Sequence, residues 1–249
     1  MVGKVYIVGA GPGDPELLTI KALKAIEEAD VILYDRLVGD EIVDMLKKIG
    51  KELIYVGKKF GERGADRQKE INELLKKLAE EGKVVVRLKG GDPFIFGRGG
   101  VEAEYLAEHG IPFEVIPGVS SINSVPACAG IPLTHPELSS SILVVTGRDG
   151  VERWCESILN GTIVILMGRN NIKEICNNLI RAGRSPDTPI AVIENGTLKN
   201  QRVFFGTLKN IADIIKKEDV RGPTLIVVGE VVKIAKKMNS INPKIVSSL

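Results

Sequence analysis

The chain has 249 residues and a formal net charge of +2, and its 44% hydrophobic and 27% charged residues are typical of a soluble globular protein of one or two domains. This charge argues neither for nor against a nucleic-acid partner, but one Trp, four Tyr and six Phe leave little to stack on bases, so we expect none. Apolar runs fall short of the ~20 residues of a membrane span, so we expect no membrane partner. Three widely spaced cysteines indicate reduced thiols in the cytoplasm, and two histidines without a C-x-x-C pair argue against a metal site.

The first half of the chain alternates short apolar runs with segments of helical periodicity. Strands are predicted at 4–9, 31–35, 52–57 and 83–88, helices at 17–29, 40–50, 68–82 and 102–110, and a last extended run at 112–118. This alternation, with nearly continuous apolar strands, predicts a mostly parallel sheet covered by helices on both faces.

The pattern changes after residue 121. A segment of mostly small residues, 122–136, leads into apolar runs at 141–147, 162–168, 189–196, 202–207 and 224–232. The last three runs have little or no helical pattern between some of them, which predicts a mixed sheet. We therefore expect an α/β protein of two domains, 1–117 and 118–249, with ligand sites beyond the carboxyl ends of the strands.

The stretch "GAGPGDPELLT" (9–19), directly after the first strand, looks like a dinucleotide-binding loop but departs from its rule. Gly9 and Gly11 fit G-x-G-x-x-G, whereas Asp14 occupies the third glycine position. Pro12 has no N–H to offer a pyrophosphate, and the carboxylate of Asp14 would repel one. The loop therefore suits a ligand without phosphate, unless it is simply a tight turn that Asp14 caps.

A second glycine-containing loop, "RLKGGDPFIFGRGG" (87–100), follows the fourth strand. Its adjacent glycines would let the backbone approach a ligand closely, and Asp92 can accept hydrogen bonds from hydroxyl or amino groups. Arg87, Lys89 and Arg98 add three cations. The alternative is a surface turn with solvated charges, although exposed turns seldom contain as many large apolar residues as the stretch "PFIF".

Asp35 and Lys58 stand at the ends of two successive strands, and in a parallel sheet both would emerge at the same edge. There they could serve as base and acid, or they could form a simple surface ion pair. The geometry alone favours neither role over the other. Asp35 also lies about 20 residues after the glycine turn, where a dinucleotide site keeps its ribose-binding acid, so an NAD-dependent oxidoreductase stays open.

Together these motifs resemble the uroporphyrinogen-III C-methyltransferases of the tetrapyrrole methyltransferase family. The matching stretches are "VGAGPGDPELLT", "VILYDRLV", "VVRLKGGDPFIFGRGG", "VIPGVSS" and "AGIPLTH", followed by "IENGT", "QRVFFGTL" and "GPTLIVVGEVV", over roughly residues 3–233. The wider family, with its cobalamin-pathway methylases, shares the first loop and the two-domain plan. "YDRLV" and "KGGDPFIFGRG" point to this branch.

The resemblance implies S-adenosylmethionine as the cofactor, which has a sulfonium, an amine, a carboxylate and a ribose but no phosphate, bound in the cleft between the two domains. It carries the family's cofactor contacts over to Pro12, Gly90, Gly91, Asp92, Ile95, Ser120, Ser121, Met167 and Gly196. From sequence alone, Met167 would be assigned to the core, and Ser120 and Ser121 could be ordinary helix caps.

The resemblance also implies two successive methyl transfers, to carbons two and seven of uroporphyrinogen III, giving precorrin-2 for sirohaem or cobalamin biosynthesis in a cytoplasmic homodimer. The family counterpart of Asp35 is assigned as base and that of Lys58 as acid. The substrate is a polycarboxylate, and its expected partners are Arg36, Lys59 and Arg98, with Arg63 and Arg67 as further candidates.

Some stretches depart from the family pattern. "GKKFGERGADRQKEIN" replaces a His- and Pro-containing loop, Pro136 replaces the Arg of "LTHR", and Arg148 replaces the His of "TGH". Three rival functions remain: another tetrapyrrole-pathway methylase, a non-catalytic tetrapyrrole carrier, and the NAD-dependent oxidoreductase, against which Asp14 and the second glycine loop argue.

Overall fold

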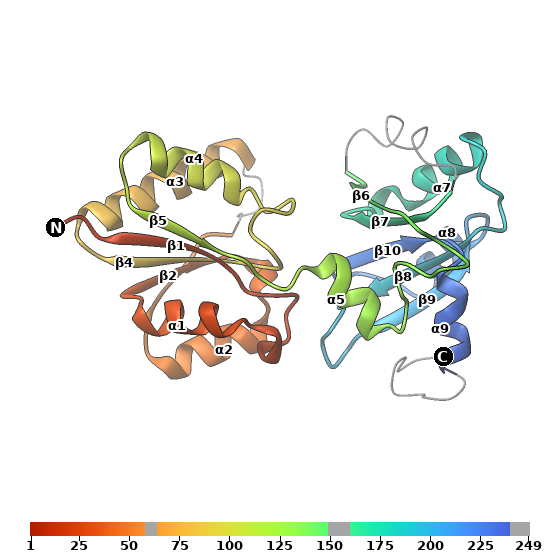
Figure 1. Ribbon diagram of the computed structural model, residues 1–249, viewed down its shortest axis with the longest axis horizontal. Coiled ribbons are helices and arrows are strands. Elements are labelled where there is room, and N and C mark those ends of the chain that lie inside the picture. Colours follow the sequence, from red (N-terminus) through yellow and green to blue (C-terminus); the bar gives the residue numbers. More distant parts are fainter. Residues whose placement is uncertain (58–63, 149–159, 240–249) are drawn as a thin grey trace. The chain divides into compact units, whose positions relative to one another are not determined.

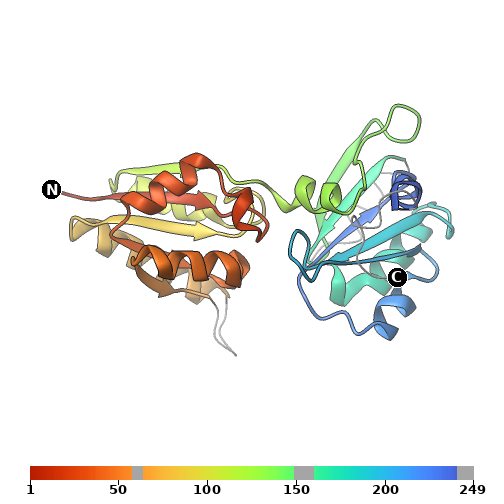
Figure 2. The ribbon, with the colours of Figure 1, turned by 90° about the horizontal axis from the view of Figure 1, so that it is seen from below.

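The computed structural model describes residues 1–57, 64–148 and 160–239. The chain divides into two compact units, Met1–Ser120 and Ser121–Leu249, each built around its own sheet (Figures 1 and 2).

The first unit contains a five-stranded sheet in the order β3-β2-β4-β1-β5, in which every pair of neighbours is parallel. Its strands are β1 (Lys4–Gly9), β2 (Val31–Tyr34), β3 (Glu52–Tyr55), β4 (Val84–Lys89) and β5 (Phe113–Ile116). The central strands β4 and β1 are almost wholly buried, as expected for a sheet with both faces covered.

Helices cover both faces of this sheet (Figure 1). α1 (Ile20–Glu28) and α2 (Asp40–Ile49) pack on one face, and α3 (Gly64–Glu80) and α4 (Gly99–Glu108) pack on the other. Because side chains alternate along a strand, Val85 and its neighbours at odd-numbered positions of β4 face α3 and α4. Arg87 and Lys89 therefore point to that side.

The second unit contains a mixed five-stranded sheet in the order β6-β7-β10-β8-β9. β6 and β7 are parallel, whereas β10 is antiparallel to both β7 and β8, and β9 is antiparallel to β8. Its strands are β6 (Ile142–Thr146), β7 (Thr162–Leu166), β8 (Pro189–Glu194), β9 (Arg202–Thr207) and β10 (Thr224–Val228).

Two described helices cover each face of this second sheet. α7 (Ile172–Arg181) and α8 (Ile211–Lys217) share one buried cluster, and α5 (Ser121–Cys128) and α9 (Val232–Asn239) share the other. The sequence pattern did not predict α5, because its small residues show little helical periodicity and Pro126 lies inside it.

The predicted fold class is confirmed: the first sheet is parallel, the second is mixed, and the strands follow the expected order. None of the described helices combines the length and the hydropathy that crossing a membrane requires.

Candidate functional site

All strands of the first unit end at one edge of its sheet, because they are parallel. The loops after β1, β2 and β4 bring Pro12, Asp35 and the pair Gly90–Gly91 to this edge. The loop after β3 runs into residues 58–63, so the predicted positions Lys58 and Lys59, like Arg63, lie outside the described residues.

Glycine backbones allow the loops after β1, β4 and β5 to touch. A Cβ atom on Gly9 would lie 2.5 Å from the Cα of Gly118 and 2.6 Å from the carbonyl oxygen of Gly91. Gly91 has a φ of 69° and donates to the Gly11 carbonyl at 2.6 Å, while the Gly11 N–H donates back at 3.2 Å. The contacts between the loops therefore already require these glycines, whether or not a ligand approaches them.

Gly90 has a similar packing role. A Cβ on Gly90 would lie 2.5 Å from the carbonyl oxygen of Leu37, in the short 3-10 turn Arg36–Val38 that follows β2. The glycine pair thus lies directly against the turn that Asp35 begins.

Asp92 closes the second glycine loop. Its Oδ1 accepts from the Phe94 N–H at 2.9 Å, and its Oδ2 accepts from the Gly118 N–H at 3.2 Å. The following residues turn outward: Phe94 is 57% exposed and Ile95 38%. The loop therefore offers an apolar surface beside the glycine pair, a feature that often marks a binding site.

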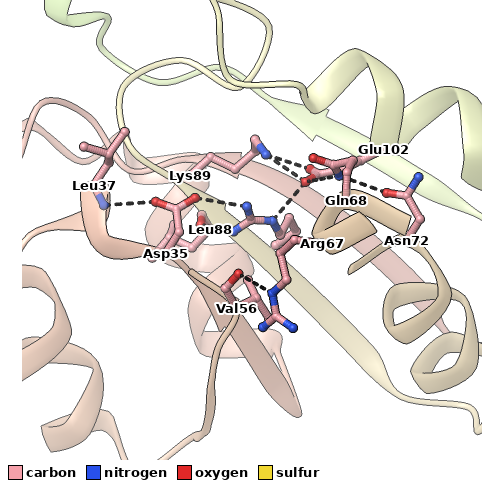
Figure 3. Close-up of polar contacts among 10 residues, drawn as sticks. Asp35, Leu37, Val56, Arg67, Gln68, Asn72, Leu88, Lys89 and Glu102 are labelled. Carbon is pink, nitrogen blue, oxygen red and sulfur yellow. Dashed lines mark hydrogen bonds and ion pairs between the residues drawn. The ribbon is translucent and has the colours of Figure 1, made fainter. Parts of the chain in front are cut away.

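Both carboxylate oxygens of Asp35 accept hydrogen bonds (Figure 3). Oδ1 accepts from the Leu37 N–H at 3.0 Å, and Oδ2 accepts from an Nη of Arg87 at 3.0 Å. The side chain keeps 26% of its surface exposed, and each oxygen retains a further lone pair. Asp35 is thus held in place and remains accessible.

Arg87 belongs to a buried charge cluster, which we define as Arg87, Lys89 and Glu102. The Arg87 Nε donates to Glu102 at 3.1 Å, and the Lys89 Nζ donates to both Glu102 oxygens at 2.8 and 2.9 Å (Figure 3). Gln68 on α3 donates to the same carboxylate at 3.2 Å. Burial lowers the pKa of the Lys89 ammonium and the charge of Arg87 lowers it further, while Glu102 acts in the opposite direction.

The buried charge cluster overturns one interpretation of the second glycine loop. The alternative of solvated surface charges is wrong for Arg87 and Lys89, because each is only 3% exposed and ion-paired. Arg98, in contrast, is an exposed surface charge. It lies at the start of α4 and has a φ of 61°.

The arginines expected to bind substrate differ in accessibility. Arg36 and Arg98 are both exposed. Arg67 is turned inward: its Nε donates to the Val56 carbonyl at 3.2 Å, and Nη1 pairs with Glu70 at 2.6 Å. The first unit therefore presents Arg36 and Arg98, and not Arg67, to an anionic ligand.

In the second unit, Met167 and Gly196 follow neighbouring strand ends. β7 and β8 both run antiparallel to β10, so their carboxyl ends lie at the same edge, on either side of the start of β10. In register, Leu166 and Glu194 pair with adjacent residues of β10. The topology alone therefore brings these two predicted cofactor positions to one edge.

The backbone at this edge adopts unusual conformations. Met167, Asn195 and Thr197 have positive φ values of 57°, 51° and 72°, which non-glycine residues seldom adopt and which tend to occur at functional sites. Met167 is also 43% exposed, so the assignment of this residue to the core is wrong. Its side chain is available for a ligand at this edge.

Gly196 makes room for α5. A Cβ at this position would clash with the side chain of Val125, which packs between α5 and the sheet. Ser121 is the first residue of α5 and Ser120 directly precedes it, and both are partly buried. Gly196 thus fixes where the helix that begins at Ser121 lies.

Glu194 anchors the end of β8. Burial acts to raise its pKa, but the N–H groups of Gly222 and Arg221 and the guanidinium of Arg202 outweigh that and lower the pKa. These contacts border a polar hollow of about 550 Å³ beside Asn195. The backbone that carries Gly196 is therefore firmly held.

Sequence reasoning missed the pairing of Arg87 with Glu102. One signal was present, because Glu102 lies one helical turn before the buried Leu106 and so falls on the inner face of its predicted helix. A carboxylate on such a face needs a cation, and buried Arg87 and Lys89 supply two.

Comparisons with known proteins identify the family of this chain. The family model for tetrapyrrole (corrin/porphyrin) methylases matches residues 4–212. A Methanocaldococcus jannaschii protein named uroporphyrinogen-III C-methyltransferase is 53% identical over 240 residues, which cover 94% of this chain and 98% of that protein. A siroheme synthase from Pseudomonas putida is 50% identical, and the match covers 95% of this chain but only 52% of that relative. The chain thus spans about half the length of the siroheme synthases that it matches.

Among solved structures, uroporphyrin-III C-methyltransferase from Thermus thermophilus complexed with S-adenosylhomocysteine superposes with a TM-score of 0.80 at 41% identity, covering 93% of this chain and all of that one. The matches in sequence and in structure extend over both units. This chain belongs to the tetrapyrrole (corrin/porphyrin) methylase family.

Proposed function

We propose that this chain transfers methyl groups from S-adenosylmethionine to carbons two and seven of uroporphyrinogen III, giving precorrin-2. The observation that carries the proposal is the 53% identity to the uroporphyrinogen-III C-methyltransferase of M. jannaschii, over 98% of that relative's length. The product would enter sirohaem or cobalamin-type biosynthesis.

The chemistry of the residues predicted to contact the cofactor fits S-adenosylmethionine. Pro12 offers no N–H and Asp92 offers a carboxylate, so this set suits a ligand with an amine and a sulfonium better than one with a diphosphate. Ile95 and Met167 add exposed apolar surface. We assign cofactor contact to these four residues together with Gly90, Gly91, Ser120, Ser121 and Gly196.

When bound, S-adenosylmethionine supplies an electrophilic methyl group, and its alignment with the accepting carbon contributes much of the acceleration. Asp35 would balance the positive charge that develops on the attacking pyrrole and accept the proton that the macrocycle loses. The exposed part of its carboxylate serves this role, while the Leu37 N–H and Arg87 fix its orientation. We assign Lys58 as the acid and Arg36, Lys59 and Arg98 to the substrate carboxylates.

The alternatives are less well supported. A dinucleotide site would need the loop after β1 to hold a diphosphate, yet Pro12 offers no N–H and Asp14 occupies the third glycine position. Another tetrapyrrole methylase would share the fold: cobalt precorrin-4 methyltransferase also superposes with a TM-score of 0.80, but at 29% identity. A non-catalytic carrier would have no need for an oriented base.

The direct test is incubation with uroporphyrinogen III and methyl-labelled S-adenosylmethionine. We expect a product heavier by two CH₂ units, because each transferred methyl group replaces one hydrogen, with the label at carbons two and seven by mass spectrometry and NMR. Binding of uroporphyrinogen III without turnover would instead identify a carrier, and methylation of a later intermediate alone would identify another methylase of the pathway.

The variant Asp35→Asn should keep the shape of the turn but lose the proton acceptor. We expect turnover to fall by ~10²–10⁴-fold, the usual contribution of a general base. The affinity for S-adenosylhomocysteine, measured by calorimetry, should stay within about threefold. Weakened cofactor binding with intact turnover would instead overturn the assignment of Asp35 as the base and place it in cofactor binding.

The variant Met167→Ala should weaken S-adenosylhomocysteine binding by about 10-fold, since burying a large apolar side chain contributes roughly 1.5–3 kcal/mol. The thermal unfolding midpoint should hardly change, because the wild-type side chain is exposed and alanine meets the same backbone strain. Met238→Ala, at a methionine with 41% exposure on α9, is the matched control and should leave binding unchanged. Equal affinities in both variants would remove Met167 from the cofactor site.

We also propose that the chain acts in the cytoplasm as a homodimer, as the family resemblance implies. Light scattering at micromolar concentration should give twice the mass of 27.0 kDa. A clean monomer mass would overturn this part of the proposal.

A further inference from the structure

We propose that Arg87 is a positioning residue for Asp35 and that the buried Glu102 limits how strongly Arg87 stabilises the Asp35 carboxylate. The inference rests on the proposed function, because it assigns a task to a charge cluster beside the proposed base.

Arg87 is fixed from three directions. Its guanidinium donates to Asp35 and to the Leu88 carbonyl through its two Nη atoms, at 3.0 and 2.9 Å, and to Glu102 through Nε at 3.1 Å (Figure 3). Its planar fork therefore cannot turn without breaking several hydrogen bonds. Together with the Leu37 N–H, it sets the plane of the Asp35 carboxylate.

Glu102 controls the charge that faces Asp35. Its side chain has no exposed surface and accepts from Arg87, Lys89 and Gln68. Two buried cations thus share two carboxylates, Glu102 and Asp35. Without the charge of Glu102, both cations would act on Asp35 alone, would hold it more firmly as the anion and would weaken it as a proton acceptor.

A purely structural role explains this arrangement poorly. Buried ion pairs contribute little net stability compared with apolar packing, because desolvation offsets their attraction. At the opposite edge of the same two strands, the exposed Asp30 joins β2 to β4 through two hydrogen bonds to the Val84 backbone, at 2.7 Å to its carboxylate and at 2.8 Å from its own N–H. The costly cluster lies at the edge where Asp35 is accessible.

Three variants and one control test the inference. Arg87→Lys keeps the positive charge but loses the fork, Glu102→Gln removes one buried negative charge, and Asp35→Asn removes the proposed base. Asp30→Asn makes the same change as Asp35→Asn at the opposite end of β2. For each we would measure kcat, KM, the pH–rate profile, S-adenosylhomocysteine affinity and thermal unfolding.

We expect Arg87→Lys to lower kcat by about 10–100-fold, because small misplacements of a reacting group cost that much, with KM and cofactor affinity within about threefold. In the Asp35→Asn background the same change should lower kcat by less than about threefold, since Arg87 acts through Asp35. Asp30→Asn should keep wild-type kcat.

The pH dependence gives a second test. Glu102→Gln should shift the acidic limb of the rate profile to lower pH and reduce the plateau rate. Adding Lys89→Met removes one cation, restores the charge balance and should return the limb toward the wild-type position. If Glu102→Gln does not fold, this charge-balanced double variant carries the test: its limb should match wild type, and any other position contradicts the inference.

Other results separate the inference from the function. If wild type methylates uroporphyrinogen III and Asp35→Asn does not, but Arg87→Lys keeps full kcat, the positioning role is wrong and the function stands. Additive losses in the Arg87→Lys/Asp35→Asn double variant would likewise mean that Arg87 acts independently of Asp35. If wild type shows no methylation, the proposed function itself fails.

Discussion

Parallel strands that all end at one edge force their loops into the same small space, and backbone contact between glycines is what makes this possible in the first unit. The loops after β1, β4 and β5 approach so closely that the Cβ of any other residue at Gly9 would meet the backbone of Gly118. Gly90 similarly brings the loop after β4 against the turn after β2. Asp35 can therefore lie close to the second glycine loop because the loop residues that face the turn after β2 have no side chains.

The charges at this edge place an energetic demand on the fold. Leaving one partner of a buried ion pair unmatched typically costs about 3–5 kcal/mol, a large share of the ~5–15 kcal/mol by which a domain is stable. The cluster avoids that cost because its cations and carboxylates balance and every one is hydrogen-bonded. Apolar cores on both faces of the sheet supply the stability that surrounds it.

Much of this architecture could be predicted from sequence, because apolar periodicity and glycine placement are local signals. They gave the strand order along the chain, the parallel first sheet and the sheet edge at which Asp35 lies. They did not give α5, whose small residues and Pro126 mask its helical character. Nor did they pair Arg87 with Glu102, because that contact joins a strand to a helix and depends on which faces meet.

Met167 shows a different limit. Its apolar side chain at the end of an apolar run favours a core position, and only the positive φ turns it outward. Backbone conformation at a single residue leaves no periodic trace in a sequence. For the pair Gly90–Gly91, the motif was easy to recognise in the sequence. The sequence did not reveal, however, that the loops need these glycines for their own packing.

The contact between Gly196 and Val125 has a consequence for how this protein can vary. A side chain at position 196 would occupy the volume that the Val125 side chain now fills. The two positions therefore compete for the same space, although they lie 71 positions apart in the sequence (196 − 125). A side chain at position 196 is compatible with the same helix placement only if the residue at position 125 becomes smaller. Among relatives that keep α5 in place, a side chain at 196 should therefore occur together with a smaller residue at 125, and an isolated substitution of Gly196 should displace the helix that begins at Ser121.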